Sequence, residues 1–183
     1  MLDACVLYPA PLRDLLLSLA AAGLYRAKWS QQIHDEWTRN LLKNRPELEP
    51  ERLRTTCTRM NIAVPDSLVT GYEDLIGSLQ LSDPDDCHVL AVAIRSDADA
   101  IITFNQRDFD ESELGKYGVY TEHPDEFVSN MIALYTPRVI STVREMRARL
   151  KNPQKSVEDF LNTLHQQGLP QAVGRLSEYA NAL

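Results

Sequence analysis

Residues 83–104 read DPDDCHVLAVAIRSDADAIITF and carry most of the information about the fold. An acidic turn that ends at Asp86 runs directly into an apolar segment, residues 87–95, which predicts a buried helix. Residues 98–104 then predict a strand, and their continuous apolar run suits a strand covered on both faces of a parallel sheet. This alternation of helix and strand predicts an α/β fold, in which ligands bind at the carboxyl ends of the strands.

The chain before this segment continues the alternation. Residues 1–7 predict a short first strand that Pro9 and Pro11 close, and only two residues precede Asp3. Further short strands are predicted at 62–64 and 117–120. Helices are predicted at 12–22, at 31–43 behind the N-cap Ser30, and at 51–60.

The character of the sequence changes after Pro137. Residues 138–151 predict a charged amphipathic helix, Ser156 is placed to start another helix, and a last short helix runs to the end. We therefore expect a main domain at residues 1–134 and a helical C-terminal extension at residues 135–183. The extension is too small to bury much core alone, so we expect it to pack on the main domain or on a partner.

Composition limits the classes of function. The chain has 183 residues, with 19 Lys and Arg against 26 Asp and Glu, which gives a formal net charge of −7. This balance argues against a protein that coats nucleic acid through bulk positive charge, but not against an enzyme that holds nucleic acid through local basic residues and metal ions. Cys5, Cys57 and Cys87 are widely spaced and odd in number, which argues against a disulfide framework and predicts a cytoplasmic location. The apolar run at 15–22 is too short to cross a membrane.

Acidic residues at the predicted edge of the sheet indicate the chemistry. Asp3 lies in or beside the first strand, Asp86 starts the apolar helix, and Asp108 follows the strand at 98–104. Strand ends and helix starts on one edge of a parallel sheet lie close together, so these three carboxylates could share a pocket. Crowded carboxylates repel, and a divalent cation relieves the repulsion; an all-oxygen site fits Mg²⁺ or Mn²⁺ better than zinc. Such a site predicts metal-assisted hydrolysis of a phosphodiester.

Each carboxylate also has a structural explanation that stays open. Asp86 could be only an N-cap, and Asp83 could cap the same turn. Glu36 could be an exposed helix residue, and Asp108 could close a turn. Only their combination favours a functional site.

Several conspicuous side chains are better explained by packing. His34 and Glu36 form an H-x-E pair similar to that of zinc deaminases, but the matching P-C-x-x-C segment is absent. His88 is expected to be a half-buried helix residue more often than a phosphate contact. Trp29 and Trp37 are expected to pack in the core rather than to stack on bases.

Four segments together resemble the PIN-domain nucleases: LDACVLY at 2–8, WSQQIHDEW at 29–37, DPDDCHVLA at 83–91 and IITFNQRDF at 101–109. They keep the order of the family motifs and span residues 1 to about 130. The resemblance implies a three-layer α/β/α fold with a central parallel sheet and an Mg²⁺- or Mn²⁺-dependent ribonuclease site. Many bacterial relatives are VapC-type toxins that a small antitoxin neutralises. The helical tail resembles the C-terminal extension in one branch of these toxins.

The resemblance also implies roles for individual acidic residues. Asp3, Glu36, Asp86 and Asp108 would form the acidic set of the active site. Asp3 and Asp86 would contact the metal ion directly. A metal-activated water would then be the nucleophile, and no catalytic histidine is required.

Other residues are implied to support the acidic set. Thr103 and Asn105 would orient carboxylates or the scissile phosphate through hydrogen bonds. Arg13 and Arg107 are the basic residues best placed in sequence to bind RNA, whereas the remaining arginines are expected mostly at the solvated surface. Cys5 stands where an asparagine is common in the family, and a thiol is a poorer hydrogen-bonding group.

The acidic residues predict metal-assisted hydrolysis of a phosphodiester, and the resemblance implies an endoribonuclease that is the toxin of a toxin–antitoxin pair. Its expected partners are an RNA substrate, a small antitoxin and, as a homodimer, a second copy of the chain. The first alternative is a PIN-fold regulator that binds RNA or protein and cuts weakly or not at all, which Cys5 favours slightly. The second is a small phosphatase or nucleotide hydrolase, although the absence of a P-loop argues against NTP hydrolysis.

Overall fold

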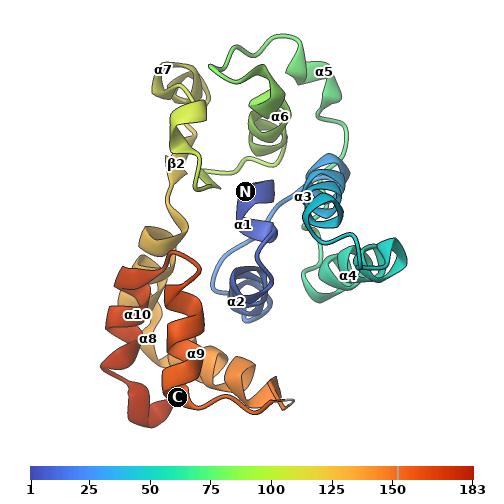
Figure 1. Cartoon of the computed structure of the whole chain (residues 1–183). Coiled ribbons are helices and arrows are strands. Elements are labelled where there is room, and N and C mark those ends of the chain that lie inside the picture. The colour runs from blue at the N-terminus through green and yellow to red at the C-terminus, as the bar shows by residue number, and fades with distance from the viewer. Residues whose placement is uncertain (152) are drawn as a thin grey trace. The chain divides into compact units, whose positions relative to one another are not determined.

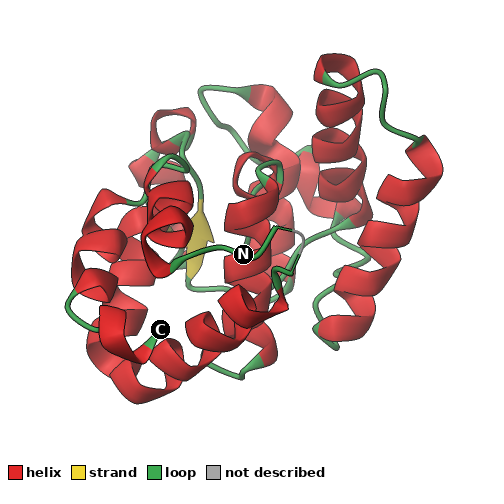
Figure 2. Cartoon of the chain, turned by 60° about the horizontal axis from the view of Figure 1, so that its bottom comes forward, coloured by secondary structure: helices red, strands yellow, loops and turns green. Residues whose placement is uncertain are grey.

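The structure, a computed structural model, describes residues 1–151 and 153–183. Helices make up most of it, and the described residues contain one small sheet (Figure 2). Strands β1 (Ala100–Ile102) and β2 (Tyr120–Glu122) run parallel, with Ala100 opposite Tyr120. Leu2 adds a single parallel bridge to Ile102. The parallel pairing is confirmed, but in the described residues the sheet is much smaller than the central sheet that we expect from the sequence.

The prediction of a first strand at residues 1–7 is wrong. The helix α1 (Ala4–Leu7) stands in its place, preceded by the bridge residue Leu2. The reason is Asp3, whose backbone is extended and whose Oδ1 accepts a hydrogen bond of 2.6 Å from the Ala4 N–H. An acceptor in this position starts a helical turn. Asp3 therefore lies between the bridge to β1 and a helix.

Two other predicted strands are also corrected. Residues 62 and 63 end the helix α4 (Pro50–Ala63), and Ile62 is 73% exposed, so this apolar run is not a buried strand. The strand predicted at 117–120 begins only at Tyr120, because residues 115–117 form a short 3-10 helix and Gly118 turns the chain with a φ of 69°. Both segments are short apolar runs, whose period alone does not separate helix from strand.

The helices that carry two of the acidic motifs are confirmed. Helix α3 (Gln31–Asn44) begins after Ser30, whose Oγ accepts a hydrogen bond of 3.3 Å from the Ile33 N–H. Helix α6 (Cys87–Arg95) has the predicted bounds, and a 3-10 turn at residues 84–86 leads into it. Both helices belong to the first of two compact units, which comprises Met1–Tyr8 and Ala27–His123. Within this unit α3 lies beside α1 and α4 (Figure 1).

A partly buried polar network around Asn61 joins α3 to α4. Asn61 Oδ1 lies 2.8 Å from Trp29 Nε1 and 3.1 Å from His34 Nε2. Trp37 Nε1 donates to His34 Nδ1 at 3.1 Å. Because an indole N–H only donates, His34 carries its proton on Nε2 and gives it to Asn61. Both tryptophans are fully buried, which confirms that they pack in the core.

The second unit comprises Pro9–Arg26 and Pro124–Leu183. Its helices are α2 (Ala10–Ala21), α8 (Pro124–Arg149), α9 (Val157–His165) and α10 (Pro170–Ser177). Helix α8 is kinked at Tyr135, whose φ of −133° and ψ of 38° are not helical, two residues before Pro137. Ser156 begins α9 as predicted, because its Oγ accepts a hydrogen bond of 3.0 Å from the Asp159 N–H.

Asp125 ties α8 to α10 inside this second unit. Its buried carboxylate accepts hydrogen bonds from the backbone N–H groups of Gln171 and Ala172, at 3.0 Å and 2.9 Å. Arg175 Nε also donates to Ser129 Oγ at 2.6 Å. The first turn of α10 is therefore capped by a side chain from a distant helix. The boundary between nuclease domain and extension at residue 134 stays a prediction.

The remaining elements are short. They are α5 (Glu73–Ile76), α7 (Glu111–Leu114) and 3-10 turns at 106–108 and 180–182. Cys5, Cys57 and Cys87, all within the described chain, form no disulfide. None of the helices in residues 1–151 and 153–183 has both the length and the apolar character needed to span a membrane.

Candidate active site

Asp3 is the most deeply buried of the four predicted acidic residues, with 4% of its surface exposed. Its Oδ2 accepts hydrogen bonds from Thr103 Oγ1 at 2.7 Å and from Cys5 Sγ at 3.0 Å, while Oδ1 faces the Ala4 N–H. Burial raises the pKa of Asp3 above its usual value, and these hydrogen bonds oppose the rise. Three donors therefore hold this carboxylate in one orientation.

Polar contacts of Thr103 and Cys5 connect the residues that follow β1 with the segment that carries Asp3. The buried Thr103 hydroxyl donates to Asp3 and accepts a hydrogen bond of 2.9 Å from the Asn105 N–H. Cys5 Sγ lies 3.4 Å from the same hydroxyl and accepts a hydrogen bond of 3.3 Å from the Phe104 N–H. Cys5 thus makes more polar contacts than we expect of a thiol in the place of an asparagine.

Asp86 stands where the 3-10 turn at 84–86 meets α6. It occupies the N-cap position, but within the described chain its side chain makes no capping hydrogen bond, so capping alone does not explain it. The pKa of Asp86 is raised from 3.8 to about 7, first by burial and then by four neighbouring carboxylates: Asp3, Asp83, Asp108 and Glu36. The structure therefore brings the four predicted acidic residues into one electrostatic cluster, which we call the acidic cluster.

Asp83 is a fifth member of the acidic cluster that the sequence does not assign to the site. It does cap the turn as expected, because its Oδ1 accepts a hydrogen bond of 2.9 Å from the Asp85 N–H. Its charge also acts on Asp86, three residues further along. The spacing of three residues on a helical turn is the sequence signal that could have placed them together.

Glu36 projects from α3 and contacts His88 on α6. Glu36 Oε2 lies 3.4 Å from His88 Nε2, with 30% of the Glu36 side chain and 6% of the His88 side chain exposed. His88 is therefore buried rather than half-buried as predicted. Its Nδ1 is also buried and has no hydrogen-bond partner among the residues that the structure describes. This contact between helices lies two residues from Asp86.

The closing motif lies directly after β1. Asp108 is partly exposed in the 3-10 turn at 106–108, and Arg107 is exposed beside it. Asn105 is exposed, and its backbone N–H reaches Thr103. Arg13 lies on α2 in the second unit, so its role in binding RNA stays a prediction.

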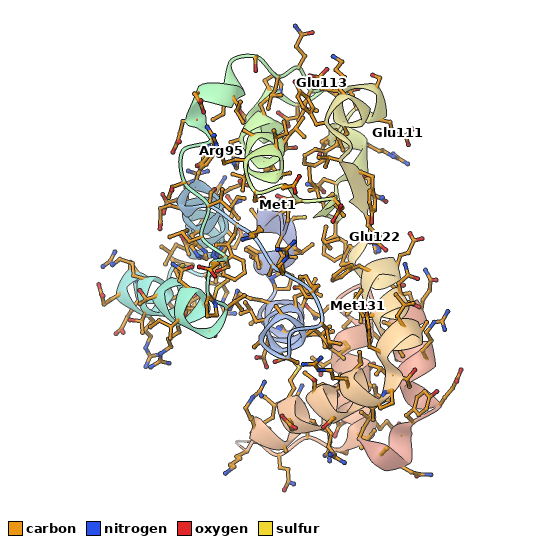
Figure 3. All side chains as sticks on the ribbon, turned by 180° about the vertical axis from the view of Figure 1, so that it is seen from behind. Met1, Arg95, Glu111, Glu113, Glu122 and Met131 are labelled. Carbon is orange, nitrogen blue, oxygen red and sulfur yellow. The ribbon has the colours of Figure 1, made fainter. Side chains whose placement is uncertain are left out.

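Two other arginines are engaged in surface ion pairs. Arg95, labelled in Figure 3, ends α6, and its Nη2 lies 2.8 Å from Asp74 Oδ1. Arg45 pairs with Glu47. Both contacts agree with the expectation that most arginines lie at the solvated surface.

The donors of the acidic cluster fit a hard divalent cation. All five are carboxylates, whose oxygens suit Mg²⁺ and Mn²⁺, and a cation would relieve the repulsion that raises the pKa of Asp86. Across residues 1–151 and 153–183, no three His, Cys, Asp or Glu side chains form a group that could hold a metal ion. Mg²⁺ usually keeps several waters and uses only one or two protein carboxylates, so a magnesium site does not require three protein ligands.

Comparison with known proteins assigns the family. Residues 1–107 match the family described as PIN domain, and residues 124–178 match the family described as VapC50 C-terminal domain. The protein named "Putative ribonuclease VapC50" from Mycobacterium tuberculosis (strain ATCC 25618 / H37Rv) is 30% identical over 120 residues, which cover 63% of this chain and 70% of that protein. No solved structure matches the chain. Because the first match covers more than half of the sequence, the chain belongs to the PIN-domain family, and it carries a VapC50 C-terminal domain behind its PIN domain.

Proposed function

We propose that this protein is a metal-dependent endoribonuclease that hydrolyses RNA phosphodiester bonds. The observation that carries the proposal is the acidic cluster, in which burial and four carboxylates raise the pKa of Asp86 to about 7. Such crowding costs free energy in the metal-free chain and is relieved when a divalent cation binds. The ribonuclease name of the similar mycobacterial protein supports the same chemistry.

Each acidic residue has a role in this proposal. Asp3 and Asp86 would hold Mg²⁺ or Mn²⁺ directly, and Glu36 and Asp108 would add negative charge around them. The cation, when bound, lowers the pKa of water and stabilises the attacking and leaving oxygens. Thr103 keeps Asp3 oriented through its 2.7 Å hydrogen bond.

Polar and basic side chains would hold the RNA substrate in this proposal. Asn105 is exposed and lies two residues beyond Thr103, so we assign its amide to the scissile phosphate. Arg107, exposed beside Asp108, and Arg13, on α2 of the second unit, are our candidates for binding backbone phosphates of the RNA. With a net charge of −7, the protein needs such local basic residues to bind RNA at all.

We also propose that the protein is the toxin of a toxin–antitoxin pair in the cytoplasm. The nuclease domain would occupy residues 1–134 in the three-layer α/β/α arrangement implied by the family, with the helical extension at 135–183. The antitoxin would place an Arg or Lys against Asp3, Asp86 and Asp108, since a charge-assisted hydrogen bond can replace the cation there. A complex with no basic antitoxin residue near these carboxylates would contradict this part of the proposal.

Cleavage of total cellular RNA by the purified full chain tests the nuclease proposal. The reactions contain Mg²⁺, Mn²⁺ or EDTA, and the variants are Asp86→Asn and, as a matched control, Asp85→Asn at the exposed neighbour. We expect discrete fragments that require metal, persist with Asp85→Asn and disappear with Asp86→Asn. Absence of cleavage by folded protein under every metal would instead favour the regulator that binds RNA or protein without cutting.

A further inference from the structure

We propose that His88 is a positioning residue that holds Glu36 at the acidic cluster. One contact joins the two helices here: His88 Nε2 on α6 lies 3.4 Å from Glu36 Oε2 on α3. No side-chain partner for Glu36 other than this one is found in the described chain. The consequence for metal binding rests on the proposed function, whereas the contact itself does not.

Packing alone does not explain a histidine at position 88. The residues around it on α6, including Cys87, Val89 and Leu90, are buried, and the His88 side chain is 6% exposed. Its Nδ1 is buried without a hydrogen-bond partner among the described residues, which costs free energy. A leucine would fill similar space without that cost. The nitrogen that does have a neighbour is Nε2, and that neighbour is Glu36.

Glu36 is the member of the acidic cluster that most needs to be held. It is a long side chain, it is 30% exposed, and its negative charge acts on both Asp3 and Asp86. Repulsion from those carboxylates and its own rotamer freedom both favour orientations that point into solvent. A polar hydrogen on His88 Nε2 attracts the carboxylate back toward α6, two residues from Asp86.

This arrangement resembles the outer support of a metal centre, in which one side chain orients another that faces the ion. Loss of such a partner typically weakens metal binding by about 10-fold to 100-fold. Since Glu36 is not assigned to direct metal contact here, we expect the effect of losing His88 to lie at the lower end, about 10-fold.

Binding of Mn²⁺ to the RNA-free full chain, followed by electron paramagnetic resonance, tests the inference. We expect His88→Leu to weaken Mn²⁺ binding by about 10-fold, and His88→Gln, whose Nε2 can replace the ring Nε2, to recover most of it. In a Glu36→Gln background, His88→Leu should change the affinity no further. Val92→Ala, one helical turn along α6 and fully buried, is the control that lowers the melting temperature but leaves Mn²⁺ affinity unchanged.

A metal-free measurement separates this inference from the proposed function. Long-range ¹H–¹⁵N spectra of the metal-free chain should show His88 with a proton on Nε2 and none on Nδ1, and Glu36→Gln should shift the Nε2 resonance. If Glu36→Gln leaves the chemical shift of His88 Nε2 unchanged, the inference is overturned, whether or not the protein binds metal. Equal loss of Mn²⁺ affinity from His88→Leu with and without Glu36→Gln would also overturn it. If the wild type binds no Mn²⁺, the metal-dependent function fails and the spectra alone decide the role of His88.

Discussion

Replacing Asp86 by Asn should stabilise the metal-free protein at pH 8. In the folded chain the pKa of Asp86 is raised from 3.8 to about 7 by burial and by the surrounding carboxylates. The folded state therefore binds this proton more tightly than the unfolded state, so stability falls as the pH rises from about 4 to about 7. The full difference in the pKa of Asp86 between the unfolded and folded states corresponds to about 4 kcal/mol of unfolding free energy. Because Asp86 is only half-buried, solvent screening reduces it, and we expect about 1–2 kcal/mol.

The assay is urea unfolding of chelator-treated protein, followed through the fluorescence of the buried Trp29 and Trp37. Near pH 8 the free energy of unfolding of Asp86→Asn should be about 1–2 kcal/mol larger than that of the wild type. Near pH 4 the free energies of unfolding of the two proteins should be equal. Asp85→Asn removes the same charge from an exposed neighbour and should give no such gain. Saturating Mg²⁺ should stabilise the wild type and not Asp86→Asn. An equal gain from Asp85→Asn, or no gain from Asp86→Asn at pH 8, would refute the crowding of carboxylates around Asp86.

Three further substitutions test other contacts. Asn61→Leu leaves two buried ring N–H donors without an acceptor, so the free energy of unfolding in urea should fall by about 2–4 kcal/mol; a loss below 1 kcal/mol would contradict the network. Asp125→Ala removes the cap of α10 and should cost about 1–2 kcal/mol, with faster hydrogen exchange at the first N–H groups of that helix. Thr103→Val removes a donor to Asp3 and should weaken Mn²⁺ binding by about 10-fold; unchanged affinity would show that this hydrogen bond does not orient the carboxylate.

Local signals in the sequence were sufficient for the helices that carry the acidic motifs. Helix α6 has its predicted bounds because an acidic turn changes abruptly to a long apolar run. Helix α3 begins after Ser30 because a serine side chain can accept the orphan N–H of the first turn. The convergence of Asp3, Asp86 and Asp108 was also predictable, since it needs only that chain segments meet at one edge of the parallel pairing.

Other features depend on contacts that local patterns do not contain. An aspartate is compatible with both the end of a strand and the start of a helix. At Asp3 the hydrogen bond from the Ala4 N–H to the side chain favours the start of a helix. The burial of His88 beside Glu36 depends on how α3 packs against the start of α6, which no periodicity specifies. The contacts of Cys5 also depend on distant parts of the chain, because Thr103 and the Phe104 N–H lie almost one hundred residues further along the sequence.

In the proposed function, carboxylates from separate segments of this PIN domain form one centre for a divalent cation. The most direct test is an anomalous difference map from a crystal of the full chain soaked in Mn²⁺, recorded near the manganese absorption edge. We expect a peak at bonding distance from carboxylate oxygens of both Asp3 and Asp86, and its loss in Asp86→Asn. A peak bound elsewhere, or none at these carboxylates, would contradict it.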